Sequence, residues 1–219
     1  MMNTLPSLLD SMKPLYSAVV CDILDGLGYP NQALPAHLRP LTPSHKLLGR
    51  AFTARAAVVE AAPEEPYKLE IEAVERMGAG DILVVACSHD RSCGFWGELL
   101  TTACLYKGIR GVVMDACTRD VWKIKDLDFP VFGIGYHPAD SKGRLDIVEL
   151  ECPAVFDGVE VRTGDYLLGD EDGLVAIPAA LLEEAVRLAL QKVSGENIVR
   201  KELSEGVSMG EVFRKYGIL

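Results

Sequence analysis

Several patterns that mark common functional classes are missing from this sequence. There is no Walker pattern and no GxGxxG between a strand and a helix, so nucleotide binding has no support. The four histidines form no HxxxH or similar pair, so a histidine metal site has little support either. Lys and Arg number 22 against 32 Asp and Glu, and the net charge of −10 argues against a nucleic-acid partner. A small anionic substrate is still compatible with this balance, because a local site can be positive on an acidic protein.

Long apolar runs and paired cysteines are also missing. No uncharged apolar stretch approaches the roughly 20 residues that span a membrane, and the opening MMNTLPSLLDSMKPLYS lacks the basic start and apolar run of a signal peptide. The six cysteines are scattered and form no CxxC pair, which excludes the zinc-ribbon and thioredoxin signals. The chain is too long and too poor in cysteine for a disulfide scaffold. We therefore expect a cytoplasmic protein with reduced cysteines and no membrane partner.

The composition that remains is that of an ordinary globular protein, with 49% hydrophobic and 25% charged residues. The 219 residues contain no repeats and no obvious linker, so we expect one domain over 1–219. Its core should cover about 17–178, and 179–219 should form a C-terminal helix and tail that contact another subunit. Helices are expected at 5–12, 17–27, 67–77, 97 onward, 121–127 and 179 to about 201. Strands are expected at 49–59, 82–86, 111–115, 129–134, 147–155, 159–162, 166–169 and 174–177.

This order of elements predicts the fold class. Helices and strands alternate in the first half, and short strands separated by turn signals follow in the second half. The apolar run at 82–86 is typical of a strand that is covered on both faces. We therefore predict an α/β fold with parallel strands at the centre, antiparallel hairpins packed on them, and helices at both ends of the chain.

The stretch from Gly94 to Asp120 has the features of a binding site at the edge of a sheet. Residues 97–100 should open a helix, and the N–H groups of a first turn have no partner within the helix, so they attract a carboxylate or phosphate. An apolar strand at 111–115 follows, and then Arg119 and Asp120. In a βαβ unit the helix start, the guanidinium and the carboxylate would meet in one crevice. Such a crevice suits a small dianionic acid and a hard metal ion.

The same residues also have an ordinary structural interpretation, which carries at least equal weight on residue chemistry alone. Arg119 and Asp120 would then be a surface pair at a helix start, and Glu98 an acidic residue favoured by the helix dipole. Thr118 would cap the helix at 121–127, and Ser17 would cap the helix at 17–27. We expect His89 to be a loop residue, and the other candidate groups to be buried thiols or solvated lysines.

The chain resembles the RraA-like family, which includes class II 4-hydroxy-4-methyl-2-oxoglutarate/4-carboxy-4-hydroxy-2-oxoadipate aldolases that also decarboxylate oxaloacetate. The resemblance runs over roughly 17–206. It is carried by the segments CDILDGLG, CGFWGELLTTACLYKGIRGVVMDACTRDVWKIKDLDFPVF and GDYLLGDEDGLVAIP. The most specific part is WGELL followed by Arg-Asp about twenty residues after Glu98. The resemblance implies a compact α/β/β domain that forms homotrimers or homohexamers, with the substrate pocket between subunits.

The resemblance also implies roles for individual residues. Asp120 would be the one direct protein ligand of Mg²⁺ or Mn²⁺, and Arg119 would contact the keto and carboxyl oxygens of the substrate. Glu98 would bind a metal water, as would Glu196 from a neighbouring subunit. The catalytic set would be Arg119, Glu98 and Asp120. The substrate carboxylate would be held by the backbone of Gly97, Glu98, Leu99 and Leu100, together with Arg119.

Two positions depart from the pattern of these aldolases. Lys123 stands where they usually carry an acidic residue, and Ala116 replaces a common glycine, which leaves open whether aldol cleavage or decarboxylation dominates. The expected function is metal-dependent C–C cleavage of a 2-oxo acid to give pyruvate. One alternative is a non-catalytic regulator of an RNA-processing enzyme, although the family's regulators of ribonuclease E lack the aspartate kept here as Asp120. Another is an enzyme of the same fold that acts on a different hydroxy- or oxo-acid.

Overall fold

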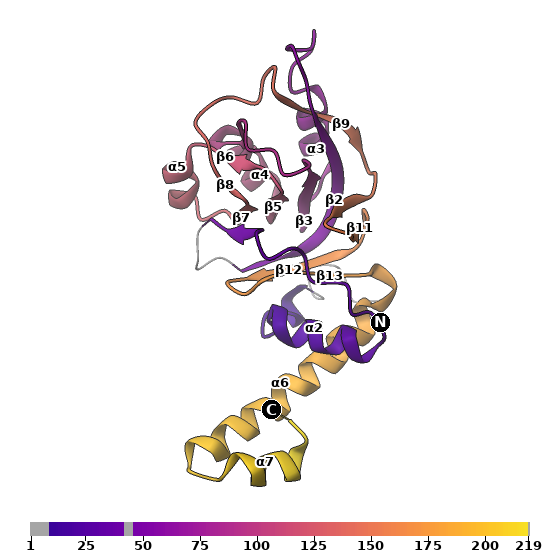
Figure 1. Ribbon diagram of the computed structural model, residues 1–219, viewed down its shortest axis with the longest axis vertical. Coiled ribbons are helices and arrows are strands. Elements are labelled where there is room, and N and C mark those ends of the chain that lie inside the picture. Colours follow the sequence, from indigo (N-terminus) through magenta and orange to yellow (C-terminus); the bar gives the residue numbers. More distant parts are fainter. Residues whose placement is uncertain (1–8, 42–45, 219) are drawn as a thin grey trace.

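The computed structural model describes residues 9–41 and 46–218. Its main feature is an eight-stranded sheet in the order β1-β7-β5-β3-β2-β12-β13, with β9 pairing to β2 (Figure 1). The strands of this sheet are β1 (Arg39–Pro40), β2 (Leu47–Val58), β3 (Asp81–Ala86), β5 (Gly111–Met114), β7 (Val131–Gly133), β9 (Leu145–Leu150), β12 (Tyr166–Asp170) and β13 (Gly173–Ile177).

The four central strands β2, β3, β5 and β7 are parallel. Every residue of β3 and of β5 is buried, because both faces of the sheet are covered. Ile82 and Val84 face one apolar cluster, and Leu83 and Val85 face another. The connections run through helices α3 (Lys68–Arg76), α4 (Glu98–Lys107) and α5 (Val121–Asp126). The predicted α/β fold with a parallel centre is therefore confirmed.

The long strand β2 makes the sheet curl into a nearly closed form, visible as the sweeping ribbon in Figure 1. Its first residues pair with β12 and its last with β9, with an irregularity between Arg55 and Ala56 that bends the strand. The hairpin of β10 (Ala154–Phe156) and β11 (Val159–Val161) packs on this sheet through Ala154, Phe156 and Val161. The single strand predicted at 147–155 is therefore wrong, because residues 151–153 separate β9 from β10.

Three short strands form a second, parallel sheet beyond the carboxyl ends of the central strands. They are β4 (Gly94–Trp96), β6 (Cys117–Thr118) and β8 (Gly135–Tyr136), which follow β3, β5 and β7 along the chain. Each lies in a segment expected to be a turn or loop, because two or three residues carry no detectable alternation. This small sheet fixes the positions of the chain segments on either side of the candidate site.

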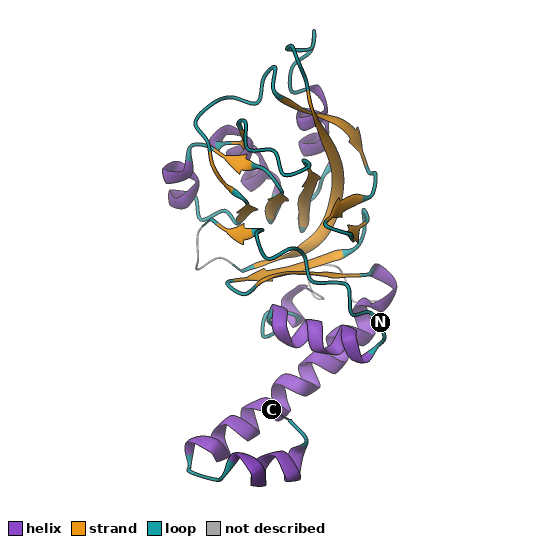
Figure 2. Ribbon diagram, in the orientation of Figure 1, coloured by secondary structure: helices purple, strands orange, loops and turns teal. Residues whose placement is uncertain are grey.

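The terminal helices cover the outer face of the β12–β13 hairpin. Helix α2 (Ser17–Gly26) and helix α6 (Leu182–Ser204) share an apolar cluster with Leu168, Val175 and Ile177. Helix α6 follows the 3₁₀ turn η1 (Ala179–Leu181) and extends away from the strands with α7 (Met209–Tyr216) (Figure 2). The tail that we expected after the C-terminal helix contains α7, and Ser208 caps this helix by accepting a hydrogen bond from the Glu211 N–H.

Two predicted caps are also wrong. Ser17 is the first residue of α2 rather than its cap, and its N–H and hydroxyl both donate to the Asp170 carboxylate, at 2.7 and 2.6 Å. Thr118 donates to the Trp96 carbonyl, and α5 begins after Asp120 instead. The helix expected at 5–12 falls partly outside the described residues. Among residues 9–41 and 46–218, no helix combines the length and apolarity that crossing a membrane requires.

Candidate active site

The small sheet brings the two ends of the Gly94–Asp120 stretch together. Strands β4 and β6 pair so that Trp96 lies beside Thr118, and the Arg119 N–H donates to the Trp96 carbonyl at 2.8 Å. The next residues along each strand are therefore Gly97, the N-cap residue of α4, and Arg119 with Asp120, which immediately precede α5. The predicted juxtaposition of a helix start, a guanidinium and a carboxylate is present in the structure.

Gly97 is the residue that permits this close approach. A Cβ atom at this position would lie 2.9 Å from Asp120 Oδ2 and 3.3 Å from Arg119 Nε. The first distance is shorter than Cβ atoms normally tolerate, so any other residue would push the carboxylate away. Gly94 is equally enclosed, since its Cβ would lie 2.3 Å from the His137 carbonyl oxygen. Both glycines therefore serve packing around the site.

The carboxylate of Asp120 is exposed and available to bind a metal ion. It adopts φ 56, in the left-handed region, and its side chain is 43% exposed. Its Oδ2 accepts from the Glu98 N–H at 3.2 Å and lies 3.9 Å from Arg119 Nε. One first-turn N–H of α4 is therefore already used by Asp120. Within the described chain, the Leu99 and Leu100 N–H groups remain to bind an anion.

Arg119 is held by residues that lie far from it in the sequence. Its Nη1 lies 3.3 Å from Asp140 Oδ1, and Asp140 Oδ2 accepts a 2.6 Å hydrogen bond from the Tyr67 hydroxyl. Burial raises the pKa of Asp140, but the Tyr67 hydroxyl and Arg119 outweigh it and keep the pKa below its ordinary value. Burial and the Asp140 carboxylate raise the pKa of Tyr67 to about 12. The chain Tyr67–Asp140–Arg119 thus fixes the guanidinium. Neither partner was among the predicted site residues.

Glu70 is a second residue that the sequence did not reveal. It lies in α3, is only 2% exposed, and its Oε1 has no hydrogen-bond partner among the described residues. Burial, with help from the carboxylates of Asp146 and Asp140, raises the pKa of Glu70 to about 8, although Arg119 opposes the shift. With this raised pKa, Glu70 carries a proton at neutral pH, so it can act as a proton donor at the edge of the site.

We expect replacement of Glu70 by glutamine to remove a pH dependence of stability. Between the ordinary glutamate pKa of about 4.3 and the raised value of about 8, the folded protein holds one proton more than the unfolded chain. Wild-type stability therefore falls as the pH rises from 5 to 8, by on the order of 3–5 kcal/mol relative to Glu70→Gln. Urea unfolding at pH 5, 6.5 and 8 measures this difference. The exposed Glu75→Gln on the same helix should keep the wild-type slope, and identical slopes in all three proteins would contradict the assignment.

These groups line one cavity of about 230 Å³. Its lining consists of Tyr67, Glu70, Ile71, Phe95, Gly97, Glu98, Leu99, Leu100, Arg119, Asp120, Asp140 and Ser141. All the site residues predicted for one subunit are therefore gathered there. Glu196 does not line this cavity within the chain, because it lies on α6 and accepts a hydrogen bond from the Tyr16 hydroxyl.

Lys123 changes the surroundings of Glu98. Its Nζ lies 3.7 Å from Glu98 Oε2, and Glu98 Oε1 accepts from the Thr102 hydroxyl at 3.0 Å. The lysine offsets the charge of one carboxylate at the mouth of the site, so the local charge is less negative than an acidic residue at 123 would make it. This suits an anionic substrate.

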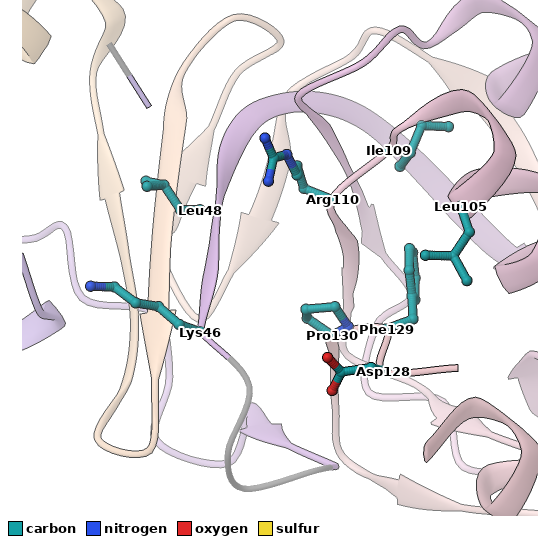
Figure 3. A pocket seen from close by; sticks show the side chains of 8 residues that line it. All are labelled: Lys46, Leu48, Leu105, Ile109, Arg110, Asp128, Phe129 and Pro130. Atoms are coloured by element: carbon teal, nitrogen blue, oxygen red, sulfur yellow. The ribbon is translucent and has the colours of Figure 1, made fainter. Parts of the chain in front are cut away.

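A larger cavity, of about 520 Å³, lies at the amino ends of the parallel strands. Figure 3 shows its charged side chains, Lys46, Arg110 and Asp128, spread around it rather than converging on one point. Lys46 is already engaged, because its Nζ donates to the Lys13 and Leu15 carbonyls. Ligands of open α/β sheets bind beyond the carboxyl ends of the strands, so we place the chemistry at the smaller cavity.

The donor set of the smaller cavity fits a hard divalent cation. Asp120, Glu98 and Asp140 offer only carboxylate oxygens, and neither a histidine nor a cysteine lines the cavity. Mg²⁺ and Mn²⁺ prefer oxygen ligands, and Mg²⁺ is commonly held by one or two carboxylates with waters and substrate oxygens completing the shell. The glycine at position 97 leaves room beside Asp120 Oδ2.

Among the relatives of the chain, some are named as aldolases and others have names that state no activity. A protein of Deinococcus radiodurans with the provisional name 4-hydroxy-4-methyl-2-oxoglutarate aldolase is 31% identical, over 72% of this chain and 93% of that protein. Protein DlpA of Legionella pneumophila is 26% identical over 98% of this chain, but the chain spans only 34% of its length.

Solved structures show the same fold. A crystal structure of an uncharacterized protein from Pseudomonas syringae pv. tomato superimposes with a TM-score of 0.87 at 26% identity, covering 98% of this chain and 96% of that one. Streptomyces coelicolor RraAS2, described as an unusual member of the RNase ES inhibitor RraA protein family, gives a TM-score of 0.79 at 27% identity over 89% and 97%.

The family model described as RraA-like (Aldolase/RraA) matches residues 17–176, which include the described strands up to Ala176 of β13 and the whole of the smaller cavity. The chain therefore belongs to the RraA-like family.

Proposed function

We propose that the protein is a lyase that cleaves a carbon–carbon bond of a 2-oxo acid or diacid and releases pyruvate. The observation that carries this proposal is the meeting of Asp120, Arg119 and the first turn of α4 around one cavity. The aldolase names of relatives such as the Deinococcus protein support the same class of reaction. Candidate substrates are 4-hydroxy-4-methyl-2-oxoglutarate and oxaloacetate.

The cofactor in this proposal is Mg²⁺ or Mn²⁺. Asp120 would hold it directly and Glu98 through water, and the bound cation would supply Lewis-acid polarisation of the keto group. The substrate carboxylate would accept hydrogen bonds from the Leu99 and Leu100 N–H groups at the start of α4. Arg119 would donate to the keto oxygen and to one carboxylate oxygen, which its planar fork can reach together.

Both reactions leave the same intermediate. In aldol cleavage, the 4-hydroxyl group would lose its proton to a water oriented by Glu98, and C4 would become a carbonyl carbon as the bond between C3 and C4 breaks. The electron pair of that bond would form the pyruvate enolate. In decarboxylation of oxaloacetate, the same electron pair is left by departing CO₂. Negative charge grows on the former keto oxygen, and Arg119, fixed by Asp140 at 3.3 Å, stabilises that charge without having to reorganise.

The enolate carbon must then take up a proton to become the methyl group of pyruvate. We assign this proton to the Glu70 carboxyl group, which is protonated at neutral pH and lines the cavity. The raised pKa, about 8, lies close to the working pH, which is where a general acid transfers protons most efficiently. Glu70 regains its proton from solvent after product leaves.

The proposal includes self-association into a homotrimer or homohexamer. Leu99, Tyr106 and Trp122 are 79%, 94% and 69% exposed on α4 and α5, and Leu99 also lines the cavity. Large apolar side chains gathered on one surface favour a protein partner. A neighbouring subunit on this surface would close the cavity. Glu196 of that subunit would then bind a water of the metal ion.

A second candidate function is non-catalytic binding to an RNA-processing enzyme. It is favoured by the similarity to RraAS2, which is described as a member of an RNase inhibitor family. This function requires a protein-binding surface but neither the cation nor pyruvate formation.

One assay separates the two functions. Pyruvate release, coupled to lactate dehydrogenase and NADH, is measured with oxaloacetate and with 4-hydroxy-4-methyl-2-oxoglutarate, with added Mg²⁺ and with EDTA. Catalysis predicts turnover with Mg²⁺ on at least one substrate, after subtraction of the enzyme-free rate, and its loss with EDTA. Turnover no faster than the enzyme-free rate on both substrates would overturn the proposal.

A further inference from the structure

A cluster of three side chains lies outside the candidate active site. His37, His89 and Asp157 each offer one ligand atom, and these atoms lie within 4.8 Å of one another. His89 Nε2 lies 2.9 Å from Asp157 Oδ1, and His37 Nδ1 lies 3.9 Å from Asp157 Oδ2. The two imidazole rings meet edge to face with centroids 4.6 Å apart. The three residues are more than fifty positions apart in the chain, so only the fold assembles them.

The backbone around the cluster is anchored in one buried core. His37 stands between the buried Leu34 and Leu38, and Asp157 directly follows the buried Phe156. All three apolar residues belong to the same hydrophobic cluster, as does Ala86 at the end of β3, before His89. The segments that carry the ligand atoms are therefore fixed relative to one another before any ligand binds.

A buried carboxylate orients His89. Asp115 is 2% exposed, and it accepts the N–H groups of Cys87 and His89, the latter at 2.8 Å. Its Oδ2 also lies 3.9 Å from His89 Nδ1, while His89 Nε2 faces Asp157. The His89 imidazole therefore lies between two carboxylates, with Asp115 behind Nδ1 and Asp157 at Nε2. A carboxylate behind the nitrogen that does not bind the metal is common among metal-ligating histidines.

His37 has a polar atom that the protein leaves unused. Its Nε2 is buried and has no hydrogen-bond partner among the described residues. Buried polar atoms are nearly always paired, so an orphan of this kind indicates a missing water or ion. The other ring nitrogen, Nδ1, is the one that faces Asp157, and its distance of 3.9 Å from Asp157 Oδ2 is longer than a hydrogen bond. We therefore take Nδ1 as the His37 atom that would bind a cation.

We propose that His37, His89 and Asp157 form a binding site for a borderline divalent transition cation, of which Zn²⁺ is the representative. Two imidazoles and one carboxylate suit Zn²⁺ rather than Mg²⁺, and water would complete a tetrahedral shell. Ligand atoms around tetrahedral zinc stand about 3.4 Å apart, so ligand atoms that are now up to 4.8 Å apart must approach one another by up to about 1.4 Å on binding. The side chains of His89 and Asp157 are 44% and 56% exposed, which leaves room for this movement.

The site ties three parts of the fold together. The cation joins the turn of the β10–β11 hairpin, the loop after β3 and the segment before β1. At a free Zn²⁺ concentration 100-fold above Kd, we expect Tm to rise by roughly 5–10 °C. This inference is independent of the proposed reaction, since the active-site cavity and this cluster share no residue.

The test is Zn²⁺ titration of the purified, reduced protein by calorimetry and thermal unfolding. One site is expected, with Kd raised at least tenfold in His37→Gln, His89→Asn and Asp157→Asn. Asparagine is chosen at 89 and 157 because both residues have positive φ, 58 and 47, which asparagine tolerates. The matched control is Asp172→Asn in the equivalent Asp-Gly turn of β12–β13, which should bind Zn²⁺ as the wild type does.

Two results would overturn the proposal. One is an unchanged Kd in His89→Asn and Asp157→Asn, both verified as folded by circular dichroism. The other is sulfur in the zinc shell by X-ray absorption, because the six free cysteines are the competing ligands. The Asp120→Ala variant should retain Zn²⁺ binding, so failure of the active-site assignment and failure of this site can be told apart.

Discussion

Replacing Asp120 with alanine is expected to lower Mg²⁺-dependent pyruvate release by at least roughly 100-fold. Asp120 is the carboxylate that lies beside both Arg119 and the start of α4, and among the described residues no other carboxylate contacts the Glu98 N–H. Its removal takes away the proposed direct metal ligand and leaves only carboxylates that would act at longer range. The coupled assay, run as a Mg²⁺ titration, measures the loss in rate and in metal affinity.

A second substitution separates the metal role from folding. Asp120 has a left-handed backbone, φ 56, in which alanine costs about 1–2 kcal/mol. Asp120→Asn keeps a side chain that tolerates this conformation and can still accept from Glu98 N–H, but it removes the charge. We expect Asp120→Asn to melt close to the wild type and still to lose most of its activity. Full Mg²⁺-dependent turnover in either variant would refute the assignment of Asp120.

Exchange of Arg119 for lysine is expected to lower kcat by roughly 10²–10³-fold, with Tm nearly unchanged. The guanidinium uses Nη1 toward Asp140 and presents Nε toward Asp120, which a single ammonium group cannot do together. The charge remains, so a role limited to attracting the anionic substrate would survive. A role in stabilising the enolate oxygen would not. Steady-state kinetics on the better substrate distinguishes a fall in kcat from a rise in KM.

The control for this exchange is Arg110→Lys. Arg110 is exposed and lies at the larger cavity, at the amino ends of the strands. Its replacement should therefore leave kcat and KM at their wild-type values. A rise in KM alone in Arg119→Lys would show that the guanidinium binds substrate without assisting bond cleavage, and the proposed role in the transition state would be withdrawn.

The sequence by itself determined the architecture and one half of the site. Wholly apolar strands such as β3, the alternation of helices with strands, and the turn signals of the later hairpins depend on neighbouring residues. The start of α4 after Gly97 and the pair Arg119–Asp120 follow from the same local pattern, because crossover topology returns consecutive strands to one edge of the sheet. Each of these features depends on residues within a single segment of about thirty residues.

Only the tertiary structure decided which other groups join them. Asp140 contacts Arg119, and Tyr67 contacts Asp140, across intervals of 21 residues or more. Glu70 joins the same cavity from α3, and the burial that raises its pKa cannot be inferred from its neighbours in the sequence. The cluster of His37, His89 and Asp157 is likewise assembled by packing in the core. The strands of the small sheet, two or three residues long, gave no periodic signal, although they align Gly97 with Asp120. Periodicity reports which face of an element is buried, whereas contacts, burial and electrostatic fields arise only when distant segments pack together.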